Sequence, residues 1–396
     1  MQDLQIIKGI NYECSGCGTC CSGWAVPMTQ ADYERVSRHD WGEIAPERYA
    51  GKDLFRPMKA YEMVGMQYTH AIKPAPEGHC PFLVDKLCFI HGQFGAEEKP
   101  SICRLFPYCF NETPSGVYAT VSFFSMAVIW NTGKSLIEQK DYLESKWVDY
   151  QRLYPGHHPN WSSVKLASGI PMTWDQYMEY EKRLLEILDE RTEPFEQRLL
   201  KGSDYLMTNL PGAQRQAVEG AAAKLKRLDR HLLVALHKLY YPVKQLGRGE
   251  GDFNLFRFLY QVAFQGTGIA MPAHNYKLEQ LSEIDWPAGD KDMEDLLYRY
   301  FYSRIFGKYY FGAGFGQLSL IAGFHHLILA YCLMKLQAKG YARQRGASTA
   351  GMLDLVASLR QMEKRLGETM LDGYAAATYE LLMFSPNRIK RIISYI

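Results

Sequence analysis

The chain of 396 residues has 47% hydrophobic and 22% charged residues, a composition typical of folded globular proteins, which excludes a chain dominated by disorder. Its 45 basic and 43 acidic residues nearly cancel, so the overall charge gives no support to broad nucleic-acid binding. Residues 1–8 show no basic segment followed by an apolar run, and we therefore expect no signal peptide and a cytoplasmic, reducing location.

Cysteines dominate the beginning of the chain, where eight of the nine lie within the first 109 residues. Cys14, Cys17 and Cys20 follow overlapping Cys-x-x-Cys spacings, and Gly16 and Gly18 give the turn between them the freedom to bring thiolates to one metal. A reducing compartment disfavours a disulfide framework. Two interpretations stay open, namely structural zinc in tetrahedral sites or a [4Fe–4S] cluster, which needs four cysteines.

We interpret seven of these residues as candidate metal ligands: Cys14, Cys17, Cys20, Cys21, Cys80, Cys88 and Cys103. Adjacent side chains usually diverge, so Cys20 and Cys21 are expected to serve different metal atoms or different sites. Arg104, which follows Cys103, is expected to compensate the charge of a thiolate.

Residues 1–125 are rich in Cys, Gly and Pro and are expected to form a small, irregular, metal-binding domain. A helix is expected to begin near Thr29, whose hydroxyl can cap the free amides, while Asp32 suits the positive first turn. The β-branched and aromatic residues of 117–124 predict a strand. The Pro and Gly content of residues 154–160 predicts a loop or linker.

Helical periodicity dominates residues 126–396, so we expect a mainly α chain whose second domain is mostly helical. Thr173 and Gln176 predict a capping box at the start of a helix. Further helical patterns cover residues 218–240, 253–264, 293–306, 318–334 and 353–366. The basic, amphipathic segment 386–393 is expected to dock its isoleucines on this domain rather than on a membrane.

Residues 309–334 contain no Asp, Glu, Lys or Arg and are long enough to cross a bilayer. Glycines open the segment and His325 and His326 interrupt it, so we expect a buried core helix with satisfied histidines and no membrane span. The Gly-rich sequence 312–316 has no βαβ unit around it, which favours a turn between helices over a cofactor loop.

The order of the cysteines carries a family resemblance. The Cys-x-x-Cys-x-x-Cys-Cys sequence is followed by Cys80-Pro81-Phe82-Leu83, by Cys88 and by Cys103-Arg104-Leu105-Phe106-Pro107. Residues 14–107 thus resemble the CxxCxxCC family of zinc- or iron-chelating domains. The longer chain, including the aromatic segment 296–306, resembles the flagellin lysine N-methylases, which carry this module before a helical region.

That resemblance implies a protein-lysine N-methyltransferase that uses S-adenosylmethionine, with flagellin as its protein partner and substrate, and it implies a [4Fe–4S] cluster. The residues themselves reveal no catalytic or S-adenosylmethionine-binding group. The Cys-x-x-x-Cys-x-x-Cys motif of radical enzymes is absent, because Trp24 stands where its last cysteine would lie. The alternative is a non-catalytic zinc- or iron-binding protein, such as a metal carrier or an assembly factor.

Overall fold

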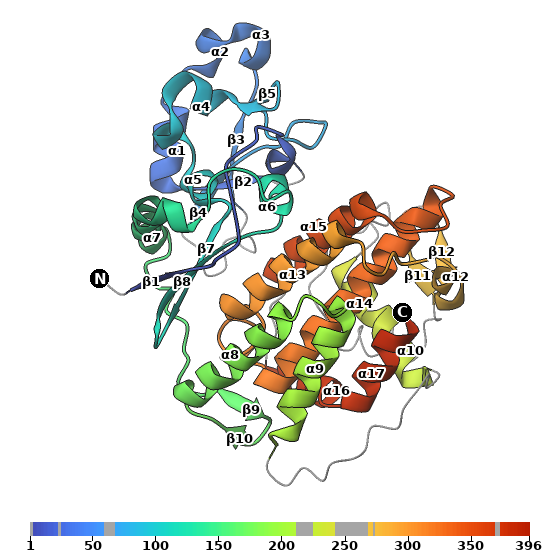
Figure 1. Ribbon diagram of the computed structural model, residues 1–396. Helices are drawn as coiled ribbons and strands as arrows, with labels where there is room; N and C mark the ends of the chain where they lie inside the picture. The colour runs from blue at the N-terminus through green and yellow to red at the C-terminus, as the bar shows by residue number, and fades with distance from the viewer. Residues whose placement is uncertain are drawn as a thin grey trace. The chain divides into compact units, whose positions relative to one another are not determined.

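The structure is a computed structural model that describes residues 3–22, 25–58, 68–210, 225–241, 268–271, 274–368 and 373–396. The chain divides into two compact units, Met1–His158 and Pro159–Ile396 (Figure 1). The division lies inside the predicted linker 154–160. The first unit extends past residue 125, where the sequence suggested a domain boundary, because α7 (Lys140–Leu153) packs on β7 (Tyr108–Thr113) and α5 (Ser101–Leu105).

Short strands and turns build the first unit. One sheet has the order β1 (Leu4–Ile6), β8 (Gly116–Val121) and β7, in which β1 runs parallel and β7 antiparallel to β8. A second, antiparallel sheet has the order β2 (Val26–Thr29), β4 (Tyr68–Ile72) and β3 (Phe55–Pro57). The hairpin of β5 (Leu83–Val84) and β6 (Leu87–Cys88) stands apart from both sheets. The strand predicted at 117–124 is confirmed as β8.

Short helices connect these strands. They are η1 (Thr19–Cys21), α1 (Gln30–Ser37), α2 (Trp41–Ile44), α3 (Pro46–Tyr49), α4 (Phe89–Phe94), η3 (Ala96–Glu98), α5, α6 (Met126–Ile129) and η4 (Ile137–Gln139). The predicted start of α1 is confirmed, since the Thr29 side chain accepts from the Asp32 amide and the Asp32 carboxylate accepts from the Thr29 amide. The core beneath α1 contains Met28, Trp41 and Phe82, which are almost fully buried.

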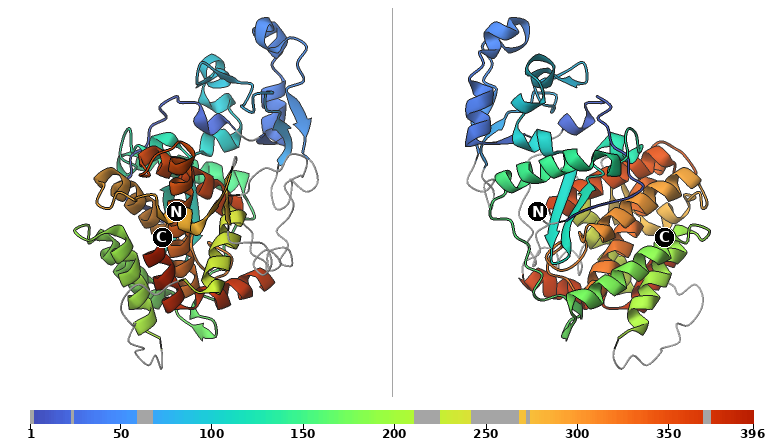
Figure 2. Two further views of the ribbon diagram at one scale, coloured as in Figure 1. Left: turned by 90° about the vertical axis from the view of Figure 1, so that its right-hand side faces the viewer. Right: turned by 60° about the vertical axis from the view of Figure 1, so that its left-hand side comes forward.

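The second unit is mostly helical, and Figure 2 shows it from two further sides. Its helices are α8 (Trp174–Asp189), α9 (Phe195–Thr208), α10 (Arg227–Tyr240), α12 (Leu278–Ser282), α13 (Lys291–Phe306), α14 (Leu320–Gln344), α15 (Met352–Glu368), α16 (Gly373–Met383) and α17 (Pro386–Tyr395). Its described strands form two antiparallel pairs, β9 (Lys165–Ala167) with β10 (Ile170–Pro171) and β11 (Gly268–Ala270) with β12 (Asn275–Lys277). The predicted helical pattern at 253–264 and the beginning of 218–240 lie outside the described residues.

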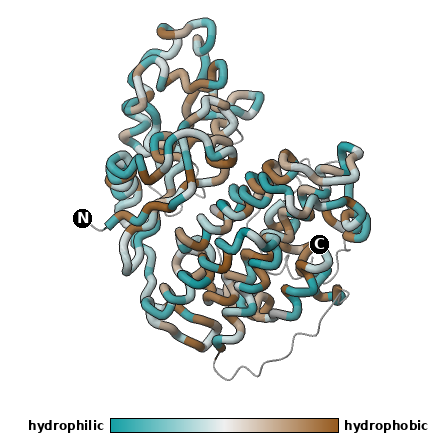
Figure 3. The backbone as a smooth tube through the Cα atoms, in the orientation of Figure 1, coloured by the Kyte–Doolittle hydropathy of each residue, from teal (hydrophilic) through white to brown (hydrophobic). Residues whose placement is uncertain are grey.

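Helix α14 is the centre of the second unit. By length and composition it is apolar enough to cross a membrane, yet its most apolar window is entirely buried, because α9, α10, α12, α15, α16 and α17 pack around it. Figure 3 shows hydrophobic and hydrophilic residues alternating along the surrounding helices, as expected for helices that each bury one side. The predicted core helix is therefore confirmed.

Two further local predictions are also confirmed. A Cβ added to Gly314 would lie 1.7 Å from the Lys308 carbonyl oxygen, so this glycine serves close packing in the turn between α13 and α14. Among the described residues, none between the end of α13 and this turn forms a strand. Helix α17 buries Ile389 and Ile392 completely against the unit, and Arg391 Nε lies 2.8 Å from the Asp229 carboxylate.

Candidate metal centre

The loop that carries the first cysteines packs tightly on the β5–β6 hairpin. Gly16 and Gly18 have φ angles of 62° and 69°, in the left-handed region that glycine tolerates. A Cβ added to Gly16 would lie 2.8 Å from Leu87 Cδ2, and one added to Gly18 would lie 3.0 Å from Leu83 Cδ1. The two glycines therefore fit the loop against the hairpin, as well as giving it a tight turn.

Backbone contacts then join the end of this loop to the next cysteine segment. The Cys80 amide donates to the Cys21 carbonyl over 2.8 Å, and Ser22 pairs with His79 in an antiparallel bridge. The Leu83 amide in turn donates to the Cys80 carbonyl over 2.9 Å, which starts the hairpin.

The hairpin and helix α5 supply the remaining thiols. Cys88 ends β6 opposite Leu83 and occupies the N-cap position of α4. Cys103 lies in α5, where its amide donates to the Pro100 carbonyl over 2.9 Å. Cys80, Cys88 and Cys103 all pack against the hydrophobic core of this unit.

Burial and neighbouring thiols raise the pKa of three of these cysteines. A hydrogen bond to Cys20, followed by burial and the nearby thiols of Cys103 and Cys80, raises the pKa of Cys21. Burial, followed by the charge of Cys88, raises the pKa of Cys80 to about 12 despite a hydrogen bond from the Phe82 backbone.

The pKa of Cys103 is also raised, first by burial and then by Cys80 and Cys88, although Lys99 opposes the rise. We name as the four-thiol cluster Cys21, Cys80, Cys88 and Cys103, because Cys80 and Cys103 act on Cys21 and Cys88 acts on both Cys80 and Cys103, while Cys80, Cys88 and Cys103 pack on one core.

The other predicted ligands precede Cys21 on the same loop. Cys14 is exposed and affects the pKa of Tyr12 and Tyr108, whereas Cys17 accepts a hydrogen bond from Thr19 Oγ1 over 3.3 Å. Cys20 interacts with Cys21 through their side chains, which differs from the expected divergence, because both residues lie in the tight 3₁₀ turn η1 rather than in extended chain.

The remaining two cysteines lie elsewhere. Cys109 Sγ donates to the Pro107 carbonyl over 3.6 Å and affects the pKa of Tyr150 and Tyr154. Cys332 is fully buried in α14. Neither cysteine is among the ligands predicted from the sequence.

The donor set fits a metal that prefers sulfur. None of the nine cysteines, all of which the structure describes, forms a disulfide, and the four-thiol cluster draws on the turn η1, the segment before the hairpin, the hairpin itself and α5. In the part of the chain that the structure describes, no three His, Cys, Asp or Glu side chains already surround a common point at metal-binding distances. The residues thus match the ligand chemistry of zinc or of an iron–sulfur cluster, and they are the ones that would hold it.

The positive charge that acts on Cys103 comes from Lys99 rather than from the predicted Arg104. Arg104 instead pairs with Glu97, and its Nη2 donates to Ser101 Oγ over 3.2 Å. The adjacent position in the sequence suggested Arg104, but helix α5 directs its side chain toward η3.

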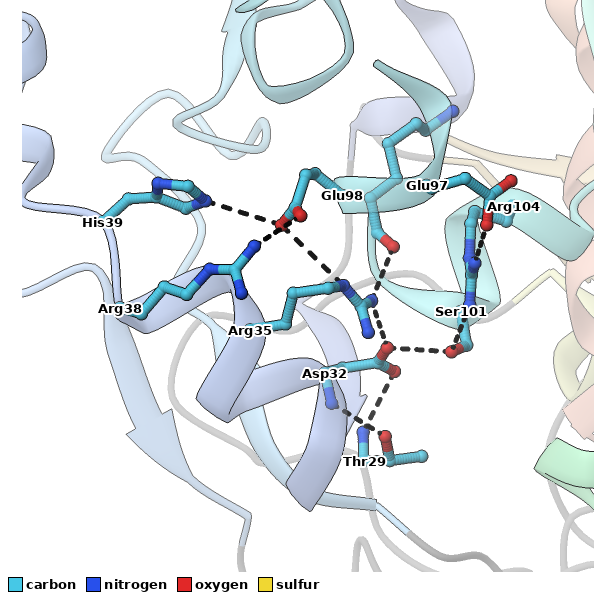
Figure 4. Close-up of polar contacts among 10 residues, drawn as sticks. Thr29, Asp32, Arg35, Arg38, His39, Glu97, Glu98, Ser101 and Arg104 are labelled. Atoms are coloured by element: carbon cyan, nitrogen blue, oxygen red, sulfur yellow. Dashed lines mark hydrogen bonds and ion pairs between the residues drawn. The ribbon is translucent and has the colours of Figure 1, made fainter. Parts of the chain in front are cut away.

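A buried carboxylate anchors the cysteine helix α5 to α1 (Figure 4). Asp32, which is 1% exposed, accepts from Arg35 Nη2 over 2.6 Å and from Ser101 Oγ over 2.8 Å. Arg35 Nη2 also donates to the Lys99 carbonyl over 2.9 Å. Although burial raises the pKa of Asp32, the hydrogen bonds from Ser101 and Arg35 leave it below its ordinary value. From the sequence, Asp32 was predicted only to suit the positive first turn of α1.

The second unit shows the buried histidines as hydrogen-bonded core residues, as expected. His325 Nδ1 donates to the Met383 carbonyl over 2.6 Å, so its Nε2 accepts from Ser203 Oγ at 2.7 Å. His326 Nε2 lies 2.7 Å from the Tyr240 hydroxyl. Burial lowers the pKa of His325 to about 4 and that of His326 to about 3, which fits neutral rings inside a core.

Comparison with known proteins supports the interpretation of the cysteine-rich region as a metal-chelating domain. Residues 13–123 match the CxxCxxCC family, whose description is "Putative zinc- or iron-chelating domain". The predicted resemblance to this family is confirmed for these residues. Similarity to an uncharacterized protein of Methanocaldococcus jannaschii reaches 32% identity over 103 residues, which cover 26% of this chain and 30% of that protein. No solved structure matches the chain.

Proposed function

We propose that the first unit is a metal-binding module in which Cys21, Cys80, Cys88 and Cys103 hold zinc or iron through sulfur. The observation that carries this proposal is that Cys80, Cys88 and Cys103 pack against one hydrophobic core, while the Cys80 amide donates to the Cys21 carbonyl over 2.8 Å. These contacts join partly buried thiols from segments far apart in the sequence. Packed thiols that form no disulfide resist ionisation together, and a bound cation would remove that mutual repulsion. Cys14, Cys17 and Cys20 are additional donors on the adjoining loop.

We favour a [4Fe–4S] cluster over zinc, following the resemblance of the longer chain to the flagellin lysine N-methylases. Such a cluster takes four cysteine ligands, which the four-thiol cluster matches in number. Full-length protein purified without oxygen is expected to contain about four irons with acid-labile sulfide. Stoichiometric zinc without sulfide would contradict the cluster while leaving the metal module intact.

A cysteine pair tests the ligand assignment. Cys103→Ser is expected to lose most of the bound metal, because a hydroxyl is a poor ligand for soft metals. Cys109→Ser is the matched control and is expected to retain it, since Cys109 contacts the Pro107 carbonyl and lies outside the four-thiol cluster. Equal metal content in both variants would contradict the assignment of Cys103.

For the whole chain we propose methyl transfer from S-adenosylmethionine to lysine side chains of flagellin. Resemblance alone supports this activity, and the alternative is a metal carrier or assembly factor. Incubating metal-replete protein with S-adenosylmethionine and flagellin should add mass in steps of about 14 Da, as each methyl group replaces a hydrogen. Failure to bind S-adenosylmethionine, together with an unchanged flagellin mass, would instead favour the non-catalytic metal-binding protein.

A further inference from the structure

A small pocket opens in the first unit where the end of α7 and the turn 154–158 lie beside β7. Its volume is about 160 Å³, and the lining residues that matter here are Glu112, Trp147, Tyr150, Tyr154, His157 and His158. No cysteine lines the pocket, so its role is separate from metal binding.

Aromatic rings form one side of the pocket. The rings of Trp147 and Tyr150 stack at an interplanar angle of 21° with centroids 5.5 Å apart. Tyr154 lies 4.8 Å from Tyr150 between ring centroids, and its hydroxyl is fixed 2.7 Å from that of Tyr68. Aromatic faces carry partial negative charge and attract cations that come within about 6 Å of the ring centre.

Two further features make the pocket electronegative. The Glu112 side chain is only 24% exposed and accepts from His158 Nδ1 over 2.9 Å. The pocket also lies at the C-terminal end of α7, where unpaired backbone carbonyls favour a positive charge. Arg152, the basic residue of this last turn, is 77% exposed and faces Asp149 at 3.8 Å.

We propose that this pocket binds an organic ammonium group, such as a quaternary amine or a methylated lysine side chain. Aromatic walls suit a bulky, weakly hydrated cation, and one carboxylate supplies charge without enough oxygens to bind a hard metal ion. The same carboxylate excludes anions. This inference holds whether or not the chain transfers methyl groups.

Calorimetric titration of the full chain with choline tests the proposal. Choline and its uncharged isostere 3,3-dimethylbutan-1-ol have nearly the same shape, so their difference isolates the charge. We expect choline to bind with a dissociation constant on the order of 1 mM and the alcohol to bind at least about fivefold more weakly. Equal binding of the two compounds, or no binding of choline, would overturn the proposal.

Two variants with opposite expected effects assign the binding to this pocket. Glu112→Gln should weaken choline binding about fivefold, whereas Glu144→Gln on α7, whose side chain is 43% exposed and does not line the pocket, should leave it unchanged. His158→Ala should strengthen binding, because the Glu112 carboxylate loses its histidine partner. Unchanged affinity in both Glu112→Gln and His158→Ala would place the binding elsewhere and refute the site.

The source of the ammonium group is distinguished by titrating free lysine and Nε-trimethyllysine. These two compounds share the same α-amino and carboxylate groups and differ only at the side-chain nitrogen. Tighter binding of trimethyllysine than of choline assigns the pocket to protein side chains, and the reverse order assigns it to small quaternary amines. Either order of affinity supports an ammonium site. If neither trimethyllysine nor choline binds, the proposal is contradicted.

Discussion

At the scale of single residues, Asp32 is the polar group that connects the ends of α1 and α5. The Asp32 carboxylate accepts hydrogen bonds from the side chains of Arg35 and Ser101. Ser101 precedes Cys103 by two positions in the same short helix, α5. Residues that hold a metal ligand in place affect affinity although they do not touch the metal. Asp32 is therefore a positioning residue for Cys103 under the metal-binding proposal.

Asp32→Asn should lower the free energy of unfolding by about 2–4 kcal/mol, because it leaves Arg35 beside a neutral partner in a buried site. It should also weaken metal binding by about 10- to 100-fold, as measured by competition with a chelator. The control Glu34→Gln, on the exposed side of α1, should change neither quantity. A destabilised variant with unchanged metal affinity would restrict Asp32 to a structural role.

Buried histidines give the second unit a defined pH dependence. Burial lowers the pKa of His237 to about 4, although its Nε2 lies 2.7 Å from the Gln337 side-chain oxygen. An unfolded histidine titrates near ~6.5, so between pH 6.5 and 4 the unfolded chain binds more protons than the folded chain. Stability therefore falls as pH falls through this window, by up to about 1.4 kcal/mol per pH unit for each such histidine.

His237→Gln should make the unfolding free energy less dependent on pH between 7 and 5, while lowering it at pH 7. Urea denaturation at a series of pH values measures both effects. The control His231→Gln lies on the same helix in a less buried position and should keep the wild-type slope. An unaltered slope in His237→Gln would show that this ring becomes protonated inside the folded protein.

The roles of single residues could be predicted from the sequence where they depend only on residues a few positions away. Thr29 and Thr173 cap their helices as predicted, because a capping box needs only side chains three residues apart. The hydrogen bond from Ser101 to Asp32 was not predicted from the sequence, because 69 positions separate the two residues and no local pattern relates them. Arg104 was misassigned for the same reason, because a neighbouring position does not fix where a side chain points.

At the scale of secondary-structure elements, one buried ion pair joins α8 to the turn that follows α13. Lys308 is completely buried, and its Nζ lies 3.0 Å from Glu181 Oε1 and 2.8 Å from the Phe306 carbonyl oxygen. Tyr177 donates a hydrogen bond to the other carboxylate oxygen. Burial lowers the pKa of Lys308 to about 8 and raises that of Glu181, so each charge depends on its partner.

Breaking this pair on one side should be more harmful than removing both charges. Lys308→Met and Glu181→Gln should each cost about 3–5 kcal/mol of unfolding free energy, because each leaves an uncompensated buried charge. The double variant should cost less than either single variant, and therefore less than their sum by well over about 1 kcal/mol. Glu186→Gln on the exposed side of α8, whose partner is Arg183, should change stability by less than about 0.5 kcal/mol. Additive effects of the two buried changes would contradict the coupling.

Elements with strong periodicity were predictable, whereas those fixed by distant contacts were not. The helices at 293–306, 318–334 and 353–366 correspond to α13, α14 and α15, since α13 and α15 repeat buried apolar residues at helical spacing and α14 is a long apolar run that is buried on all sides. The parallel pairing of β1 with β8 was not predicted. It involves three residues near the start of the chain and a strand more than a hundred positions later, which no local pattern can specify.

At the scale of the whole molecule, composition and helical periodicity predicted a mainly helical chain that begins with a cysteine-rich, irregular region. The first unit also contains α6 and α7, because helix α7 covers β7 and completes that unit. For the metal centre, the cysteines themselves were evident from composition. Which of them gather was not, because it depends on how the turn η1, the hairpin and α5 meet around a common core.

X-ray absorption spectroscopy at the metal edge of the anaerobically purified full chain tests the central claim most directly. A metal held by the four-thiol cluster should show a first shell of sulfur alone at about 2.3 Å. For the iron–sulfur form, a second shell of iron neighbours should accompany it. A first shell dominated by nitrogen or oxygen, or protein without stoichiometric metal, would contradict a metal centre built from Cys21, Cys80, Cys88 and Cys103.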